Sequence, residues 1–277
     1  MIPSRFYISA VLLLAANAVP AEPETGLPAP QLDSGYNQMY NLEFDAAHRT
    51  FGEWQRLHPD DPMGPVSDAA AYLFAEFDRL HILQSEFFVH DSNFTHARKL
   101  APDPVVRQAF DRELAASEQL ENKTLAQAPA DKNALFAMVL TRGLRADYDA
   151  LIEKRNLASL REIKDGRTVA EKLLAIDPAY YDAYLAIGVE NYMLSLKPAP
   201  VRWLLQMGGA QTDATRGIEK LRLTAEKGRY LRPYARLLLA VAALRDKDRN
   251  RAREILQELA RDFPRNRLYA EELSHLL

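Results

Sequence analysis

Residues 248–264 read Asp-Arg-Asn-Arg-Ala-Arg-Glu-Ile-Leu-Gln-Glu-Leu-Ala-Arg-Asp-Phe-Pro, and this stretch decides the fold class. Counted from Ala252, large apolar residues follow at +4 (Leu256) and +7 (Leu259), and a proline follows at +12 (Pro264). Offsets of four and seven return to one face of an α-helix, so these positions form an apolar stripe. Because proline cannot continue a helix, the stretch predicts an amphipathic helix followed by a turn.

Three further stretches keep the same offsets, with a small residue at the origin and, in two of them, a closing proline. They are Ala47, Phe51, Trp54 and Pro59; Gly166, Ala170, Leu173 and Pro178; and Gly217, Leu221 and Thr224. A small residue at the origin lets a neighbouring helix cross closely. The composition agrees with repeated helices, since 48% of the residues are hydrophobic and only 11 are glycine. The sequence therefore predicts an all-α protein.

The repeated pattern resembles the second helix of a tetratricopeptide (TPR) repeat, most clearly in residues 36–62 and 168–267. The first helix of such a repeat carries a bulky residue and then an apolar-small pair. Candidate positions for these are Tyr184, Ile187 and Gly188; Leu239 and Ala240; and Gly35 and Tyr36. The resemblance implies antiparallel helix pairs stacked as a right-handed α-solenoid with a C-terminal capping helix. The chain departs from the family norm of about 34 residues by inserting material inside repeats.

Further helix boundaries follow from apolar spacing and from capping residues. Apolar residues recur at helical spacing between Asp68 and Glu86. Residues of capping type precede four other helical segments, and they are Asp103, Asp131, Thr212 and Asn266. Gly228 suits the left-handed position that ends a helix. The last helix, 268–277, offers Glu271, Glu272 and Ser274 as a polar outer face that ends the solenoid.

Residues 1–21 have the features of a secretory signal peptide: Arg5, a short apolar run, and small residues before a cleavage site. We expect a flexible segment at 22–35 and a TPR-like helical repeat domain at 36–277, with an N-terminal part (36–155) and a C-terminal part (156–277). An exported, periplasmic location follows from the signal. The chain has no cysteine, which excludes disulfides and thiol catalysis. A net charge of −3 argues against general nucleic-acid binding.

In the TPR family, the first helix of each repeat lines a concave surface and presents partner-binding side chains. The resemblance implies this role for two groups of residues that follow Pro178 and Pro233. They are Asp182, Leu185, Val189 and Tyr192 in the first group, and Tyr234, Leu237, Val241 and Arg245 in the second. Tyrosine and arginine are the stronger candidates because they anchor interfaces most often.

Residues 198–209 form an apolar insert, bounded by prolines and a Gly-Gly pair, that does not fit the repeat. Two interpretations stay open. Either the insert is a short helix that packs Trp203 on the core, or it is a lip over the groove or an edge that touches a membrane surface.

The sequence contains no motif that specifies a reaction. His81, His90, Asp91 and His96 offer donors for zinc, but their spacing matches no known ligand pattern. We therefore expect no catalytic residue, metal or cofactor. The leading hypothesis is an exported scaffold that binds a protein or peptide partner. Alternatives are a structural subunit of an envelope or outer-membrane assembly complex, docked through Trp203 or the basic region 216–267, and a metal-dependent enzyme.

Overall fold

Helices form every regular element in the residues that the structure describes, which are 31–83 and 100–276 of a computed structural model. No strand occurs in these two ranges, so the all-α prediction is confirmed for them. The α-helices are α1 (Leu32–Tyr40), α2 (Phe44–Leu57), α3 (Met63–Arg79), α6 (Pro104–Gln127), α7 (Lys132–Asp147), α8 (Asn156–Ile176), α9 (Tyr184–Ser195), α10 (Ala199–Met207), α11 (Ala214–Lys227), α12 (Arg232–Arg245), α13 (Arg249–Asp262) and α14 (Arg267–His275).

The structure bears on the start of the predicted helical domain but not on the predicted signal peptide. The predicted signal peptide, residues 1–21, lies outside the described residues. Helix α1 begins at Leu32, so the helical domain starts before the expected boundary at residue 36. Leu32 is buried, which ties the start of this helix to the core.

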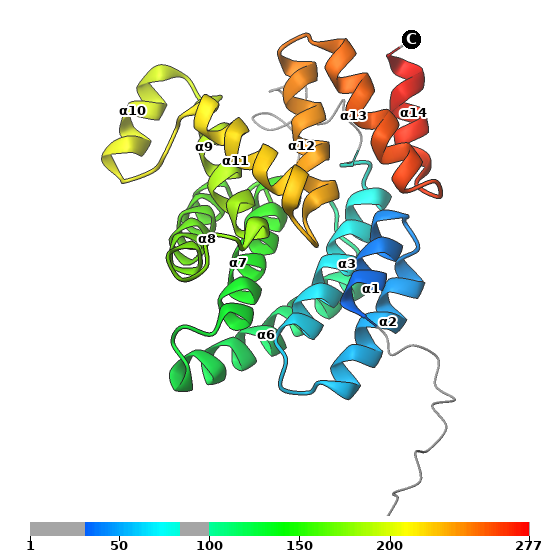
Figure 1. Ribbon diagram of the computed structural model, residues 1–277, viewed down its shortest axis with the longest axis vertical. Helices are drawn as coiled ribbons and strands as arrows, with labels where there is room; N and C mark the ends of the chain where they lie inside the picture. Colours follow the sequence, from blue (N-terminus) through cyan, green and yellow to red (C-terminus); the bar gives the residue numbers. More distant parts are fainter. Residues whose placement is uncertain (1–30, 84–99, 277) are drawn as a thin grey trace, which may run out of the picture.

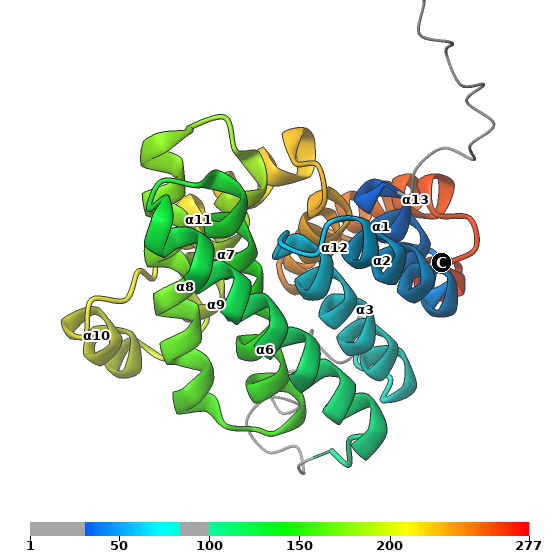
Figure 2. The ribbon, with the colours of Figure 1, turned by 90° about the horizontal axis from the view of Figure 1, so that it is seen from below.

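The helices pack as neighbouring antiparallel pairs along the chain (Figure 1). Helix α9 packs directly against α11, and α10 projects from the body between them in sequence (Figure 2). A large core of buried apolar side chains runs from Leu32 in α1 to Leu276 after α14, and a smaller cluster contains Tyr192, Leu221 and Ala242.

Small residues stand where helices cross most closely, as the repeated offsets predict. Ala47 and Ala252 are fully buried, and Gly166 is buried as well. A Cβ at Gly217 of α11 would lie 2.6 Å from the backbone nitrogen of Tyr192 in α9, which is closer than such atoms approach. The close contact of α9 and α11 therefore depends on glycine at this position.

Most predicted caps are confirmed. The side chains of Asp103, Asp131 and Asn266 each accept a hydrogen bond from a first-turn backbone N–H of α6, α7 and α14. Thr212 is a wrong prediction, because the Asp213 side chain accepts from Arg216 N–H (3.0 Å) and caps α11. The Thr212 hydroxyl instead accepts from the Gln206 side chain (2.6 Å).

Two helix ends also differ from prediction. Helix α3 begins at Met63 instead of Asp68, because a proline is tolerated in the first turn of a helix. It ends at Arg79, shortly before His81, whose φ is 57°. Gly228 is not left-handed, because its φ is −61°. Glycine fits there for another reason: a Cβ would lie 2.7 Å from Asp182 Oδ1.

The first and last helices of the array contact each other, so the chain closes on itself (Figure 1). Tyr40 of α1 donates through its hydroxyl to the Tyr230 carbonyl (3.0 Å), and its own carbonyl accepts from Asn266 Nδ2 (2.8 Å). Arg267 pairs with Asp78 of α3 (2.8 Å). Repeats that contacted only their neighbours would not make these contacts.

This closure changes the role expected for the last helix. Glu271 and Ser274 are exposed, as expected of a polar outer face. Glu272 is wrong as a member of that face, because it is buried at 5% exposure. Helix α14 packs against α13 on one side, and Asn266 before it reaches α1, so the helix is not an outer layer.

Candidate functional site

Three adjoining cavities lie at the centre of the closed array, and Tyr234 of α12 lines all of them. The aromatic cavity, of about 100 Å³, is bounded by α1, α3, α7, α8, α9 and α12 and includes the rings of Tyr36, Tyr40, Phe74 and Tyr234. The outer cavity, of about 150 Å³, adjoins it and reaches Lys197 and Arg245. A third cavity of about 30 Å³ lies towards α14.

Among the described residues, Asp147 is the one acidic side chain that lines both the aromatic and the outer cavity. It is the last residue of α7, directly before the π-helix Tyr148–Ile152. Such π-helical turns occur frequently at functional sites. The π-helix widens the backbone where α7 meets the cavities and places Asp147 at their common wall.

Most side chains that line the cavities with Asp147 are apolar, and its one hydrogen bond from the described residues comes from the Tyr234 hydroxyl to Oδ2 (3.2 Å). Asp147 is half-buried, and the two cavities that it lines are partly open to solvent. Burial raises the pKa of Asp147 to about 7, and the hydrogen bond from Tyr234 opposes this shift only in part. Strongly shifted carboxyls in cavities are typical of functional sites.

The structure brings together seven of the predicted partner-binding residues, all of which line at least one of the three cavities. They are Leu185, Val189 and Tyr192 of α9, and Tyr234, Leu237, Val241 and Arg245 of α12. Val189 lines both larger cavities. The Tyr192 hydroxyl is buried in the wall of the outer cavity without a hydrogen-bond partner among the described residues.

Asp182 is wrong as a partner-binding residue, because it is a buried structural acceptor with 4% exposure. Its carboxylate accepts hydrogen bonds from the backbone N–H groups of Arg229, Tyr230 and Leu231 at 2.9 to 3.4 Å. It lines none of the three cavities. The side chain fixes the turn before α12 and has no face towards a ligand.

Trp203 lies away from the cavities on α10, where 64% of it is exposed. The insert is a short helix, as one interpretation expected, but that interpretation was wrong to pack Trp203 on the core. No residue of α10 is buried. Val201, Leu204 and Met207 are exposed beside Trp203, so the helix presents a contiguous apolar surface.

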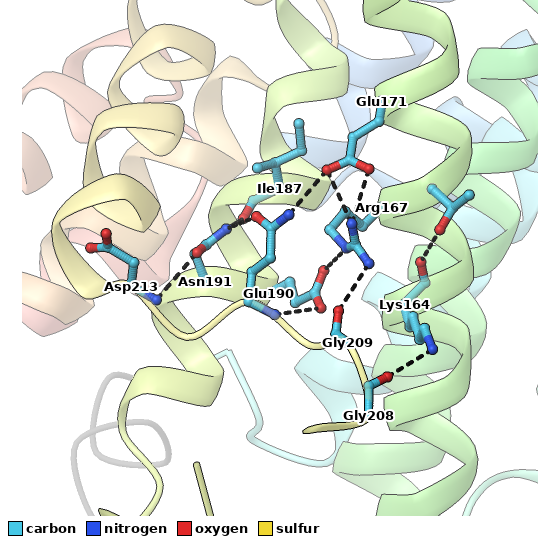
Figure 3. Close-up of polar contacts among 11 residues, drawn as sticks. Lys164, Arg167, Glu171, Ile187, Glu190, Asn191, Gly208, Gly209 and Asp213 are labelled. Carbon is cyan, nitrogen blue, oxygen red and sulfur yellow. Dashed lines mark hydrogen bonds and ion pairs between the residues drawn. The ribbon is translucent and has the colours of Figure 1, made fainter. Parts of the chain in front are cut away.

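A polar network joins residues 208–213, which follow α10, to α8 and α9 (Figure 3). Lys164 donates to the Gly208 carbonyl (2.9 Å), and Arg167 donates to the Gly209 carbonyl (3.3 Å). Arg167 also pairs with Glu190, which is fully buried, at 2.5 Å. Glu190 in turn accepts from Gln211 N–H (3.1 Å). The network holds the base of the insert, so we assign it a structural role.

Sequence reasoning missed Asp147 and the aromatic residues of α1 and α3. A signal for Asp147 exists, because it follows Leu140 and Leu144 at helical spacing and precedes Leu151. A carboxyl at such a position indicates either that the acid is buried with the apolar residues or that the helix has been predicted wrongly. Tyr36, Tyr40 and Phe74 belong to helices far away in sequence, which come to the site only through closure of the array.

Of the four candidate zinc donors, only His81 lies among the described residues. His90, Asp91 and His96 lie outside the described residues. Within residues 31–83 and 100–276, no three His, Cys, Asp or Glu side chains are grouped closely enough to hold a metal ion. No helix in these ranges is long and apolar enough to cross a membrane.

Comparison of the chain with protein-family models, curated proteins and solved structures found no match. The site geometry therefore carries the functional argument.

Proposed function

We propose that this chain is an exported, periplasmic TPR-type scaffold that holds a protein or peptide partner through an apolar group inserted into the central cavities. The observation that carries the proposal is the lining of these cavities by residues of α9 and α12. The TPR resemblance assigns partner binding to the same residues. The repeated offsets and the small residues at helix crossings support a TPR-like solenoid whose ends have met. Residues 1–21 support export.

The cavity geometry favours recognition of one protruding group over a long extended peptide. Volumes of about 100 and 150 Å³ match a single large side chain or a group of similar size. Apolar side chains that line the cavities supply the affinity, and the Asp147 carboxylate, which Tyr234 holds in place, orients the group. Binding sites typically combine apolar contacts for affinity with a few polar groups for orientation, and partner binding of this kind needs no catalytic residue.

Capture from a cell-envelope extract tests this function. We expect the purified protein to enrich a defined partner, and Val189→Phe to reduce the amount captured roughly tenfold, because the added ring occupies the space where the two larger cavities meet. The matched control is Val105→Phe, the same change at a side chain of α6 that is 75% exposed. Circular dichroism checks that both variants are folded. No enrichment by folded protein, or equal capture by Val189→Phe, would contradict the proposal.

A second candidate function is a structural role at a membrane surface, and the exposed face of α10 favours it. Half of the large apolar residues that are exposed in the described chain lie on this nine-residue helix. Lys197 precedes this helix and Arg202 belongs to it, and no acidic residue occurs between residues 195 and 212. Trp203 with aliphatic neighbours and nearby cations suits the boundary of an anionic lipid layer.

Replacing Trp203 with alanine tests that role. We expect the variant to bind vesicles of phosphatidylglycerol and phosphatidylcholine roughly tenfold more weakly in a co-sedimentation assay, because it loses the largest of the exposed apolar side chains on α10. Its melting temperature should not fall, since the exposed ring supports no core contact. Val105→Ala serves as the control for loss of an exposed apolar side chain. Unchanged vesicle binding by Trp203→Ala would exclude this role for α10.

A further inference from the structure

The described residues that line the aromatic cavity include acidic side chains but no basic one. They include Asp147 and Glu162, and no lysine, arginine or histidine is among them. Glu162 has a partner, because Arg142 Nη1 lies 3.2 Å from its carboxylate. Asp147 has none of opposite charge among the described residues, and Oδ1 of its carboxylate receives no hydrogen bond there. The cavity therefore holds one carboxylate for which a ligand can supply the counter-charge and a hydrogen bond to Oδ1.

The chemistry of the walls narrows the class of that ligand. An anion would be repelled by Asp147, and a purely apolar molecule would leave its free oxygen without a donor. An ammonium group both pairs with the carboxylate and donates hydrogen bonds to it. The rings of Tyr36, Tyr40, Phe74 and Tyr234 lie around the same space, and aromatic faces attract cations. The apolar remainder of the lining fits a hydrocarbon stem.

We propose that the aromatic cavity binds a primary ammonium group carried on a short apolar chain, with Asp147 as its counter-charge. The inference rests on the proposed function, because it names the group of the partner that enters the cavity. Tyr234 positions the carboxylate through its bond to Oδ2, which leaves Oδ1 for the ammonium. Two sources share this chemistry: a lysine side chain of a partner protein and a free alkylamine.

Isothermal titration of the purified protein with matched amines and alcohols at pH 8 tests the inference. We expect n-hexylamine to bind roughly tenfold or more tightly than 1-hexanol, as a hydrogen-bonded charge pair requires. Shortening the amine should weaken binding roughly fourfold for each methylene removed. Asp147→Asn should reduce amine affinity at least tenfold and change alcohol affinity by less than about twofold, because the variant keeps the cavity but loses its charge.

The alternative outcomes separate this inference from the proposed function. Equal binding of amine and alcohol, or an unchanged amine affinity in Asp147→Asn, would overturn the ammonium assignment and leave an apolar partner site intact. No binding of either probe by folded protein would also overturn it, while capture from the extract would still report on partner binding. A lysine dipeptide with blocked ends is compared with n-butylamine to identify the source, and its Nε-acetylated form is the control without the charge. Tighter binding of the lysine dipeptide indicates a protein partner, and tighter binding of n-butylamine indicates a free amine.

Discussion

Replacing Asp182 with alanine should destabilise the protein by about 3 to 5 kcal/mol, because three buried or half-buried backbone N–H groups lose their common acceptor. Water cannot readily replace the carboxylate at a site that is 4% exposed. For a chain of this length, that loss corresponds to a fall in melting temperature of roughly 10 °C. Thermal unfolding monitored by circular dichroism measures it. This is the largest loss of stability that we expect from a single polar side chain.

The consequences of that substitution extend beyond the turn itself. The turn at residues 229–231 also meets α1, since Tyr40 donates to the Tyr230 carbonyl and Arg229 pairs with Asp33 at 2.5 Å. We therefore expect Asp182→Ala to loosen the contact that closes the array, which hydrogen exchange at α1 would detect.

Two further variants calibrate the result. Asp182→Asn keeps one acceptor oxygen and should lie between the wild type and Asp182→Ala in stability. Asp246→Ala removes an exposed carboxyl after α12 and should change stability by less than about 0.5 kcal/mol. A melting temperature of Asp182→Ala equal to that of the wild type would show that the turn does not depend on this acceptor.

Local patterns in the sequence were sufficient for the helices but not for their closure. The stripe of Ala252, Leu256 and Leu259 is set by helical geometry, and all three residues are buried. Capping by Asp103 and Asp131 is equally local. Contacts such as Asn266 with Tyr40 join residues more than 200 positions apart. No periodicity encodes such a contact, because it depends on the summed curvature of all the intervening helices.

The same distinction explains the candidate site. The stripe positions of α9 and α12 could be predicted as inward-facing, and Val189 and Tyr234 line the cavities. The resemblance to TPR repeats assigned Asp182 to the same face. It lies in the 3-10 helix before α9, where the backbone turns the side chain towards residues 229–231 instead. Asp147 was missed because its role depends on side chains of α1, α3 and α12, which are distant from α7 in the sequence.

Replacing Asp147 with asparagine should stabilise the protein at neutral and alkaline pH, by about 2 to 4 kcal/mol at pH 8. The carboxyl of an unfolded chain ionises near the model value of 3.8, whereas burial raises the pKa of Asp147 to about 7 in the folded protein. Between these two values the unfolded state is ionised and the folded state holds a proton. Rising pH therefore favours unfolding of the wild type through this group until the folded carboxyl has also ionised. Asparagine does not ionise and avoids that loss.

The difference between the two proteins, followed by urea unfolding from pH 4 to pH 8, isolates Asp147 from other buried acids such as Glu121 and Glu190. It should be close to zero near pH 4, grow as pH rises and level off above about pH 7. Asp165→Asn, at an exposed carboxyl of α8, should show no comparable trend. A wild type as stable as Asp147→Asn at pH 8 would mean that water solvates the carboxyl, which removes the basis for ammonium binding. A gain in stability together with a loss of amine affinity would instead mark Asp147 as a residue that the fold tolerates for binding, because a solely structural position has no reason to hold an unpaired carboxyl among aromatic rings.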